Sequence, residues 1–314
     1  MKILVAPLNW GLGHATRCVP LIRKYMTAGH EVVIGGDGES LIWLYRYFPT
    51  LRFIELAPLT IRYSASSSQV GAIIKALPEL IRFSREDYRR LKTILEAESF
   101  DVIISDNRFG LYHKQVYSIY ITHQLTIRCP NGLRFLEPLL RRLHQRIYRH
   151  YDEVWVPDYE DPALSLAGDL THLLPSNPSK IKYIGPLSRF ERCKFHSSSR
   201  YQTETVAILS GPEPQRSLLE DQLMARHQPM LIVRGLTTRP FVVLKHDDIT
   251  LVPWLRDDDL VPVLQQAKKI ICRSGYTSIM DLHALGVLDK AELIPTPGQS
   301  EQEYLASLYG TVHA

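Results

Sequence analysis

A glycine-rich loop that ends in a histidine is the first segment of the chain whose residue types suggest chemistry. Asn9-Trp10-Gly11-Leu12-Gly13-His14 follows an apolar stretch at residues 2–6 and precedes a helical pattern at about 14–28. Glycine permits a tight strand-to-helix turn, and the N–H groups at a helix start attract phosphate. Gly11 and Gly13 therefore predict an anion-binding turn, although a purely steric turn fits the same residues.

His14 stands at the predicted start of that helix. The positive end of the helix dipole disfavours imidazolium, so a neutral ring that can accept a proton is expected, as a general base requires. Local packing or capping is the alternative reading. The loop does not match the dinucleotide fingerprint GxGxxG, because Thr16 stands where that pattern needs glycine or alanine. Asp37 could still take the place of the acidic residue that binds ribose in proteins with that fingerprint.

Polar residues also follow apolar segments elsewhere in the first half. Asp106 comes after residues 102–105, and His123 and Gln124 come after residues 117–121. Strand-end residues of this kind meet at one edge of a parallel sheet, where ligands bind. We therefore expect these three residues on the acceptor side of a site, with ordinary loop chemistry as the alternative.

The second half holds a similar strand-to-helix junction. Ser274 and Gly275 end an apolar segment and open a helical pattern, where they would offer N–H groups to an anion. Asp281 lies seven residues after Ser274. Its carboxylate could take both hydroxyls of a ribose, or it could be an exposed helix carboxylate.

Residues 257–259 are three consecutive aspartates that satisfy a DxD pattern, which can hold a divalent metal ion. Their position at a probable helix start favours interaction with the helix dipole instead. We therefore expect no metal site.

Short apolar segments alternate with helical patterns along the chain, as in parallel sheets wrapped by helices. The expected strands are residues 2–6, 31–34, 51–56, 102–105, 117–121 and 153–156, and then 205–209, 230–233, 249–252, 269–272 and 292–294. The prediction is an α/β protein with two Rossmann-like doubly wound domains facing across a cleft: an N-terminal acceptor-side domain over 1–165, a linker region over 166–204 and a C-terminal domain over 205–314.

Charge is distributed unevenly between the halves. Residues 1–150 carry 21 Lys and Arg against 12 Asp and Glu, whereas residues 151–314 carry 16 against 21. Residues 133–151 combine an apolar stripe with Arg141, Arg142, Arg146 and Arg149. Such a helix either packs its stripe on the sheet or contacts an anionic lipid surface. Peripheral membrane contact is therefore a hypothesis, and nucleic acid is not an expected partner.

Composition narrows the class of protein. The 314 residues are 45% apolar and 22% charged, which is ordinary for a globular chain. Four scattered cysteines without a CxxC pair indicate neither a disulfide framework nor structural zinc. The chain lacks an 18-residue apolar run and a signal-like start, so we expect a cytoplasmic protein, with the inner face of the membrane as the site of any peripheral contact.

Three segments occur in order: GLGHATR at 11–17, CRSGYTSIMDL at 272–282 and PTPGQSEQEYLA at 295–306. Together they resemble the GT-B glycosyltransferases of family 28, the group of the lipid II-forming N-acetylglucosaminyl transferase. The greatest similarity is to an uncharacterised branch with an NGLGHATR-like loop. The resemblance implies that His14 lies near the acceptor and the anomeric carbon of the donor. Gly11 and Gly13 would contact phosphate or acceptor.

The same resemblance implies a donor site in the second half. A turn at residues 185–189 would supply Arg189 for the diphosphate, although the asparagine of the family's turn is absent. Leu255 would lie over a uracil, and Asp281 would replace the family's ribose-binding glutamate. Ser210 and Gly211 would form a phosphate loop, which Pro212 and Pro214 make stiffer and poorer in N–H donors.

Gln302 and Glu303 align with the sugar-contacting glutamine pair of that family. Glutamate accepts hydrogen bonds but cannot donate one as an amide does. The change at Glu303 therefore bears on which sugar the site takes, and less on which nucleotide. The family also continues some tens of residues beyond this pair, whereas the sequence ends at Ala314.

The sequence therefore predicts an inverting, metal-independent hexosyltransferase that needs no cofactor. It would move a sugar from a nucleotide diphosphate donor, expected to be UDP-linked, to a hydroxyl acceptor of lipid-linked type. A nucleotide-sugar epimerase or hydrolase and a non-catalytic nucleotide-sugar-binding protein are the alternatives. A dehydrogenase is disfavoured because Thr16 breaks the fingerprint.

Overall fold

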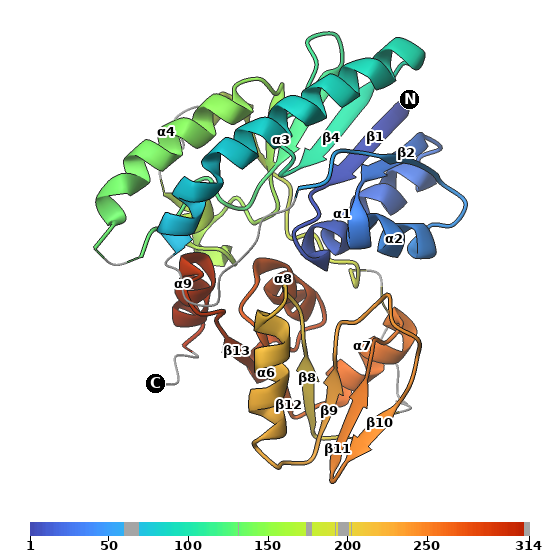
Figure 1. Ribbon diagram of the computed structural model, residues 1–314, viewed down its shortest axis with the longest axis vertical. Helices are drawn as coiled ribbons and strands as arrows, with labels where there is room; N and C mark the ends of the chain where they lie inside the picture. Colours follow the sequence, from blue (N-terminus) through green and yellow to red (C-terminus); the bar gives the residue numbers. More distant parts are fainter. Residues whose placement is uncertain are drawn as a thin grey trace. The chain divides into compact units, whose positions relative to one another are not determined.

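The computed structural model describes residues 1–59, 69–130, 132–173, 178–191, 193, 201 and 203–310. The chain divides into two compact units, Met1–Leu187 and Ser188–Ala314, each built on its own sheet (Figure 1). No helix among the described residues is both long enough and apolar enough to cross a bilayer.

The described part of the first unit forms a seven-stranded parallel sheet in the order β3-β2-β1-β4-β5-β6-β7. Its strands are β1 (Lys2–Pro7), β2 (Glu31–Gly36), β3 (Arg52–Glu55), β4 (Val102–Asp106), β5 (Tyr117–Ile121), β6 (Glu153–Val156) and β7 (Ile181–Tyr183). Its α-helices are α1 (Leu12–Thr27), α2 (Gly38–Tyr47), α3 (Gln69–Ala97), α4 (Glu137–Tyr148) and α5 (Asp169–His172).

The strand order reverses direction between β1 and β4, which are neighbours in the sheet although α1, β2, α2, β3 and α3 separate them in sequence. Both strands are mostly apolar and buried. In their register, Pro7 of β1 lies beside Asp106 of β4. Loops at the carboxyl ends of strands flanking such a reversal are the usual binding place in doubly wound sheets. The loop after β1 and the end of β4 are therefore brought together.

The described part of the second unit forms a six-stranded sheet in the order β10-β11-β9-β8-β12-β13, in which only β10 and β11 pair antiparallel. Its strands are β8 (Thr205–Ile208), β9 (Met230–Val233), β10 (Leu244–His246), β11 (Ile249–Val252), β12 (Lys269–Arg273) and β13 (Ala291–Ile294). Its α-helices are α6 (Gln215–Met224), α7 (Asp257–Gln266), α8 (Tyr276–Ala284) and α9 (Ser300–Leu308).

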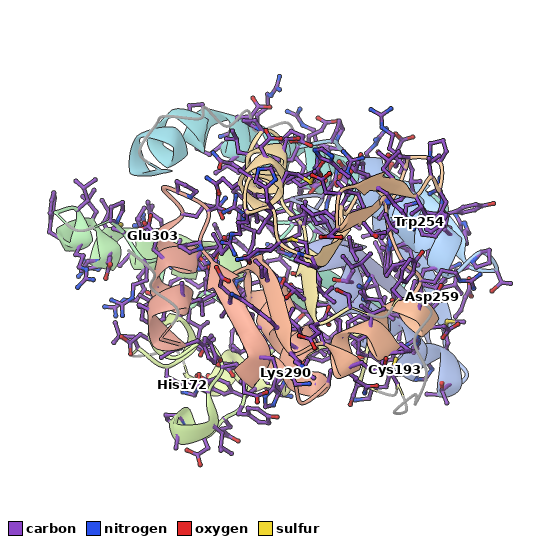
Figure 2. All side chains as sticks on the ribbon, turned by 90° about the horizontal axis from the view of Figure 1, so that it is seen from below. His172, Cys193, Trp254, Asp259, Lys290 and Glu303 are labelled. Carbon is purple, nitrogen blue, oxygen red and sulfur yellow. The ribbon has the colours of Figure 1, made fainter. Side chains whose placement is uncertain are left out.

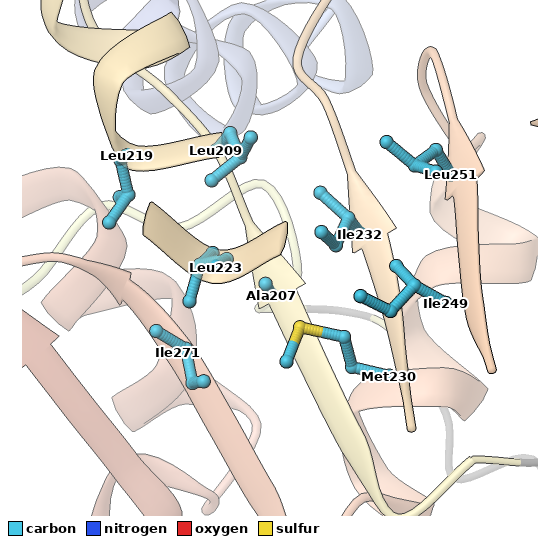
Figure 3. Packing of buried hydrophobic residues seen from close by; sticks show 9 residues of the cluster. All are labelled: Ala207, Leu209, Leu219, Leu223, Met230, Ile232, Ile249, Leu251 and Ile271. Atoms are coloured by element: carbon cyan, nitrogen blue, oxygen red, sulfur yellow. The ribbon is translucent and has the colours of Figure 1, made fainter. Parts of the chain in front are cut away.

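A core cluster joins α6 to the face of this second sheet (Figure 3). Leu219 and Leu223 are spaced four residues apart, so they lie on one face of α6, and both are buried among strand residues such as Ala207, Ile232 and Ile271. The reversal of strand order falls between β8 and β12. Residues that follow these two strands therefore occupy the binding edge of the second unit.

The predicted α/β class and the two Rossmann-like sheets are confirmed, and each expected strand overlaps an observed one. β7 and β10 were not predicted, because each has only three residues and lies at a sheet edge, where the apolar pattern is weak.

The boundary between the units falls between Leu187 and Ser188, inside the range 166–204 that the sequence analysis treats as a linker. Residues 166–187 belong to the first unit, where β7 pairs with β6 and Thr126 N–H donates to Leu170 O. Residues 174–177, 192, 194–200 and 202 of the predicted linker lie outside the described residues.

The predicted basic amphipathic helix at 133–151 forms as α4, but its apolar stripe does not pack on the sheet as a unit. Leu139 is 52% exposed and Leu143 is 36% exposed, whereas His144 and Tyr148 are buried. The inner face of α4 carries His144, which contacts Tyr120 of β5 by its ring and at 3.0 Å from the Tyr120 hydroxyl, and Tyr148, whose ring contacts His144. Ile147 packs against the same cluster.

Candidate functional site

The loop after β1 leads directly into α1. Gly11, the residue before the helix, has φ of +77°, a left-handed conformation that favours glycine. The helix begins at Leu12 rather than at His14, so Gly13 and His14 both lie in its first turn. Asn9 fixes the loop, since its Nδ2 donates to Asp37 at 3.1 Å and its Oδ1 accepts from Ser40 N–H at 3.3 Å. The histidine thus lies at a helix N-terminus on a held turn.

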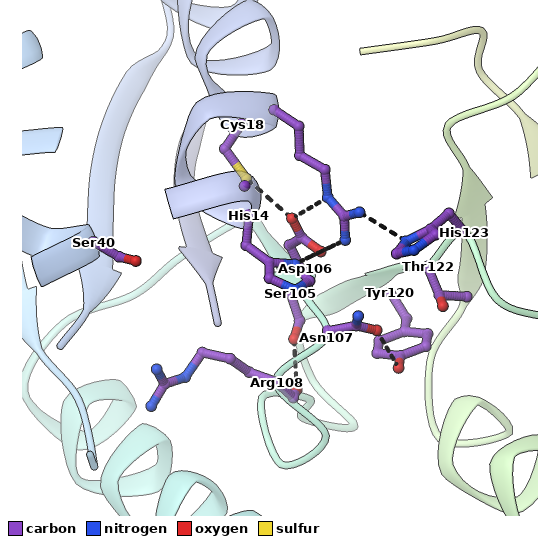
Figure 4. A network of polar contacts seen from close by, with 12 residues as sticks. His14, Cys18, Ser40, Ser105, Asp106, Asn107, Arg108, Tyr120, Thr122 and His123 are labelled. Carbon is purple, nitrogen blue, oxygen red and sulfur yellow. Dashed lines mark hydrogen bonds and ion pairs between the residues drawn. The ribbon is translucent and has the colours of Figure 1, made fainter. Parts of the chain in front are cut away.

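His14 faces Asp106, which the sheet register places at the end of β4 (Figure 4). The distance between His14 Nδ1 and Asp106 Oδ1 is 3.1 Å. The His14 side chain is 13% exposed and that of Asp106 is fully buried. A carboxylate on one ring nitrogen and a partly exposed ring are the arrangement that holds a histidine for proton transfer through its other nitrogen.

Arg17, one turn after His14 in α1, binds the same carboxylate. Its Nε donates to Asp106 Oδ2 at 2.7 Å and its Nη2 donates to Asp106 Oδ1. Nη2 also lies 2.9 Å from His14 Nδ1, and Nη1 lies 2.9 Å from His123 Nδ1. Arg17 is buried and was not among the residues predicted from the sequence. Its position three residues after His14, on the same helix face, is the signal that would have found it.

The charges at this cluster set the protonation of its members. Burial lowers the pKa of His14, and the opposing attraction of Asp106 does not cancel that effect. Burial alone would disfavour the ionised Asp106, but the Arg17 guanidinium and His14 outweigh it and hold the pKa of that carboxyl well below its usual range. Asp106 is therefore an anion, and His14 is a neutral ring at neutral pH.

Two tautomers of His14 fit this geometry. With the proton on Nδ1, the ring donates to Asp106 and Nε2 can accept a proton. With the proton on Nε2, Nδ1 accepts from Arg17. His123 has one consistent arrangement with Arg17: because a guanidinium only donates, His123 Nδ1 accepts and the ring proton lies on Nε2.

The remaining acceptor-side candidates are arranged around this cluster. Gln124 is half-buried, and its N–H donates to Thr122 Oγ1 at 3.2 Å. Asn107 has φ of +58°, a conformation that asparagine tolerates better than most residues, and its Oδ1 accepts from Tyr120 O–H at 2.8 Å. His123 thus joins the His14 cluster directly through Arg17, whereas the Gln124 backbone bonds to Thr122 and to His144.

Asp37 is not placed as a ribose-binding acid. Arg108 is fully buried and donates to Asp37 Oδ1 at 2.6 Å and to both oxygens of Asp87 at 2.8 and 3.0 Å. It also lies over the ring of Phe83. Asp37 therefore accepts hydrogen bonds from both Arg108 and the Asn9 side chain. Arg108 supports the loop through these contacts.

In the second unit, Asp281 lies against residues that precede the sheet. Ser188 Oγ donates to Asp281 Oδ1 at 2.6 Å, and Arg189 Nε lies 3.9 Å from Asp281 Oδ2 and 3.4 Å from Asp257 Oδ1. Burial raises the pKa of Asp281 to about 6, against the opposing effect of Arg189. Asp281 is therefore not the exposed helix carboxylate of the alternative reading, and Arg189 lies beside it as a cation.

Ser274 and Gly275 join β12 to α8 as predicted, with Gly275 immediately before the helix. The expectation that Ser274 offers its N–H to a ligand is wrong, because that N–H donates to Ile294 O at 3.3 Å. The Ser274 hydroxyl donates to Gln302 O at 2.8 Å. Only Gly275 of the two keeps the predicted position at the helix start.

Gln302 and Glu303 lie in the first turn of α9 and hold the turn before it. Gln302 Oε1 accepts from Thr296 N–H at 2.9 Å, and Glu303 Oε1 accepts from Gly298 N–H at 3.1 Å. Glu303 is exposed on the surface of the helix (Figure 2). A carboxylate at this position suits a backbone N–H, which explains why glutamate fits where a second glutamine was expected.

The other donor-side candidates follow strands of the second sheet. Ser210 and Gly211 are exposed after β8, and Gly211 has φ of +97°. Leu255 is half-buried between β11 and α7. The three aspartates at 257–259 form the first turn of α7, as their helix-start interpretation requires. Among the described residues, no three His, Cys, Asp or Glu side chains are placed to hold a metal ion.

The chain was compared with known proteins, and no family model matches it. Two proteins of Methanosarcina acetivorans, each named an uncharacterized glycosyltransferase, match 98% of the chain. They are 29% identical over 331 residues and 22% identical over 324 residues, with 81% and 83% of the relatives covered.

Solved structures share the fold across nearly the whole chain. The glycotransferase of kitacinnamycin has a TM-score of 0.62 at 16% identity, covering 98% of this chain and 84% of that one. The spinosyn rhamnosyltransferase SpnG, complexed with thymidine diphosphate, has a TM-score of 0.60 at 14% identity, covering 99% and 85%. The chain has a GT-B fold.

One further structure of similar fold bears on the alternatives. A putative UDP-N-acetylglucosamine 2-epimerase from Listeria monocytogenes has a TM-score of 0.52 at 12% identity, covering 99% of this chain and 88% of that one. The fold alone therefore does not separate transfer from epimerisation. The relatives named as glycosyltransferases support transfer, but none of the matches identifies the family 28 branch.

Proposed function

We propose that this protein is a glycosyltransferase that moves a sugar from a nucleotide diphosphate onto a hydroxyl acceptor. The observation that carries the proposal is the pair of His14 and Asp106, a partly exposed neutral histidine held by a buried carboxylate at a helix N-terminus. The GT-B fold and the names of the relatives support a sugar nucleotide as the donor. A UDP-linked hexose and a lipid-linked acceptor are the specific forms of the proposal.

In the proposed mechanism, His14 donates its Nδ1–H to Asp106 and accepts the acceptor's hydroxyl proton at Nε2. The acceptor oxygen attacks the anomeric carbon while the bond to the diphosphate breaks, so one displacement inverts that carbon. Asp106 stabilises the imidazolium that forms, and Arg17 keeps the carboxylate in place.

The departing diphosphate gains negative charge as the bond breaks. We assign its stabilisation to Arg189 and to the helix start at Gly275, where an anion would meet the positive end of the α8 dipole. No metal enters this scheme. Activity that persists in excess EDTA is the expected result, and loss of activity that Mg²⁺ restores would contradict it.

Activity should depend on pH through His14. Because burial lowers its pKa from the ordinary 6.5, the basic form persists to lower pH than for a free histidine. At saturating donor, which removes the pH dependence of nucleotide binding through Asp281, kcat/KM for the acceptor should therefore stay level from pH 8 to below 6.5 and fall when His14 becomes protonated. The measurement is the pH profile at saturating and at low acceptor. An acidic limb with its midpoint above 6.5 would count against His14 as the base.

Asp281 should contribute to nucleotide affinity through the sugar hydroxyls of the nucleoside. Asp281→Ala is expected to weaken UDP binding about tenfold or more, as for hydrogen bonds to a charged acceptor, and to weaken dTDP binding less because deoxyribose lacks the 2′-hydroxyl. Because the carboxylate form accepts these bonds, UDP affinity should rise with pH through about 6.

Calorimetry with UDP and dTDP checks this, using Asp289→Ala of the second unit as the matched control. Equal losses for both nucleotides would exclude a contact with the 2′-hydroxyl, and unchanged UDP affinity would remove Asp281 from the donor site.

The reaction class is tested by supplying UDP-sugars with a lipid-linked or soluble hydroxyl acceptor and identifying every product by mass spectrometry. A glycosylated acceptor with release of UDP is the expected result. Free sugar would identify a hydrolase, a new epimer of the donor would identify an epimerase, and saturable binding without any product would identify a binding protein. Each of the last three results overturns the transferase proposal.

A further inference from the structure

The edge of the second sheet exposes an apolar segment. β10 is the outermost strand, and within the described sheet it pairs only with β11 (Figure 1). The residues that lead into and begin this strand are Phe241, Val242, Val243 and Leu244, which are 40%, 56%, 42% and 48% exposed. Consecutive residues of an extended chain point to opposite faces, so solvent reaches both faces of this edge segment, defined as residues 241–246. An exposed apolar edge is a template for pairing with another strand.

The hairpin between β10 and β11 decides which backbone groups of the edge segment face outward. Its loop consists of Asp247 and Asp248, and it joins His246 to Ile249, which lie opposite each other. In such a hairpin the two residues beside the loop exchange backbone hydrogen bonds, and the next pair along does not. Lys245 therefore directs its N–H and C=O away from β11, toward the open edge of the sheet.

The same alternation reaches the residues before β10. Extending the register of β10 with β11 places Phe241 opposite Trp254, and the centroids of these two rings are 5.2 Å apart. The edge segment is therefore aligned along β11 beyond the bounds of the strand. Val243, two residues before Lys245, accordingly directs its backbone groups to the open edge as well.

Charge along the edge segment selects the direction in which a partner strand runs. Arg239 precedes the apolar residues, whereas Asp247 and Asp248 follow them, and all three are exposed. Two copies that run antiparallel bring the cationic end of each beside the acidic end of the other. Two copies that run parallel bring like charges together, which is unfavourable across paired strands. The segment is thus complementary to itself in the antiparallel direction.

We propose that this protein forms a two-fold dimer in which β10 pairs with β10 of a second copy and the two sheets become one. The axis passes through Val243, which lies opposite Val243 of the second copy. Phe241 then lies opposite Lys245, so outward backbone groups meet and a cation lies beside each aromatic ring. Arg239 of each copy comes beside Asp247 of the other, which gives two ion pairs.

A second copy uses every feature of this edge. A strand of another protein would bond to the backbone, but it would need its own acid and cation at the matching ends. The aspartates would repel a nucleic acid, which also gives apolar side chains little to bury. The proposal concerns the second unit alone, so it does not depend on the proposed reaction.

Sedimentation velocity of the full chain over a range of concentrations tests the proposal, with a reversible monomer–dimer equilibrium as the expected result. Arg239→Asp and Asp247→Arg should each raise the dissociation constant about tenfold or more, because each places two like-charge pairs at the interface. Combining the two substitutions should restore the parental constant, since unlike charges face each other again. Asp289→Arg, at an exposed aspartate elsewhere in the second unit, is the matched control and should dimerise like the parent.

Val243→Pro removes an N–H that points to the partner and leaves the hydrogen bonds between β10 and β11 in place. This variant should stay monomeric where the parent is dimeric, and its thermal unfolding midpoint should match that of the parent at concentrations where both are monomeric. A parent that is monomeric at every concentration overturns the proposal. So does a dimer that Val243→Pro or the single charge reversals leave unchanged, or a double reversal that fails to restore it.

A disulfide reports the register directly. In the proposed dimer Val242 of one copy lies opposite Leu244 of the other, in a pair without backbone hydrogen bonds whose Cα atoms are about 4.5 Å apart, which a disulfide can span. The double variant Val242→Cys and Leu244→Cys should form a covalent dimer under mild oxidation, and each single variant should form much less. Equal cross-linking in single and double variants would show that the strands do not pair in this register and would overturn the proposal.

Discussion

His14→Ala is expected to lower turnover by about 10²- to 10⁴-fold, the usual contribution of a general base. Nucleotide affinity should remain close to that of the parent, because the donor candidates belong to the second unit. Alanine removes the nitrogen that accepts the hydroxyl proton but leaves the turn at Gly11 and the helix start unchanged. Steady-state kinetics with calorimetry of UDP binding separates the two effects.

The control for this substitution is His246→Ala, which removes a histidine that is 64% exposed in the second unit. It should retain full activity. Asp106→Asn tests whether Asp106 orients His14 or only stabilises the fold. Loss of the carboxylate lowers the pKa of His14 further, because Asp106 raises it in the parent. The acidic limb of the pH profile should therefore move to lower pH while kcat falls. Near-parental turnover in His14→Ala would refute its role as base.

The largest loss of stability is expected for Arg108→Met. This residue is fully buried between Asp37 and Asp87, and its removal leaves two carboxylates in the interior without a counter-charge. Breaking one side of a buried ion pair costs about 3 to 5 kcal/mol of the free energy of unfolding. Chemical denaturation of the first unit measures the effect.

Arg82→Met supplies the comparison, since Arg82 is 78% exposed and its ion pair with Glu79 is a surface contact worth about 1 kcal/mol at most. Adding Asp87→Leu to Arg108→Met should recover part of the lost stability, because one uncompensated carboxylate disappears. A change of less than about 1 kcal/mol in Arg108→Met itself would show that water reaches these carboxylates.

The sequence was informative where one local pattern decides the structure. Apolar runs bounded by turns predicted the strands, and the glycine loop predicted the first turn of α1 together with His14. Asp106 was expected on the same side of the sheet because parallel strands end at one edge. Its specific contact with His14 depends on the register between β1 and β4, which no local pattern reveals.

Features that depend on tertiary contacts were harder to foresee. Arg17 reads as one more basic residue of an amphipathic helix until Asp106 and His123 are placed beside it. Asp37 resembled a ribose-binding acid, but Arg108, in the loop after β4, donates a hydrogen bond to its carboxylate. Leu139 and Leu143 formed an apolar stripe in sequence, and only the packing of His144 and Tyr148 shows that the stripe faces outward.

The pairing of β1 with β4 also governs when the contact between His14 and Asp106 forms during folding. His14 and Asp106 are 92 residues apart in sequence, and they meet only after β4 has docked beside β1. Closing a loop of that length is an entropic cost that must be met before the contact forms. A nascent or partly unfolded chain can therefore make the glycine turn, a local structure, but lacks the carboxylate that holds its histidine. The contact between His14 and Asp106 is therefore a property of the folded unit, and under the proposed function a chain in which β4 has not docked would lack the base that this contact holds.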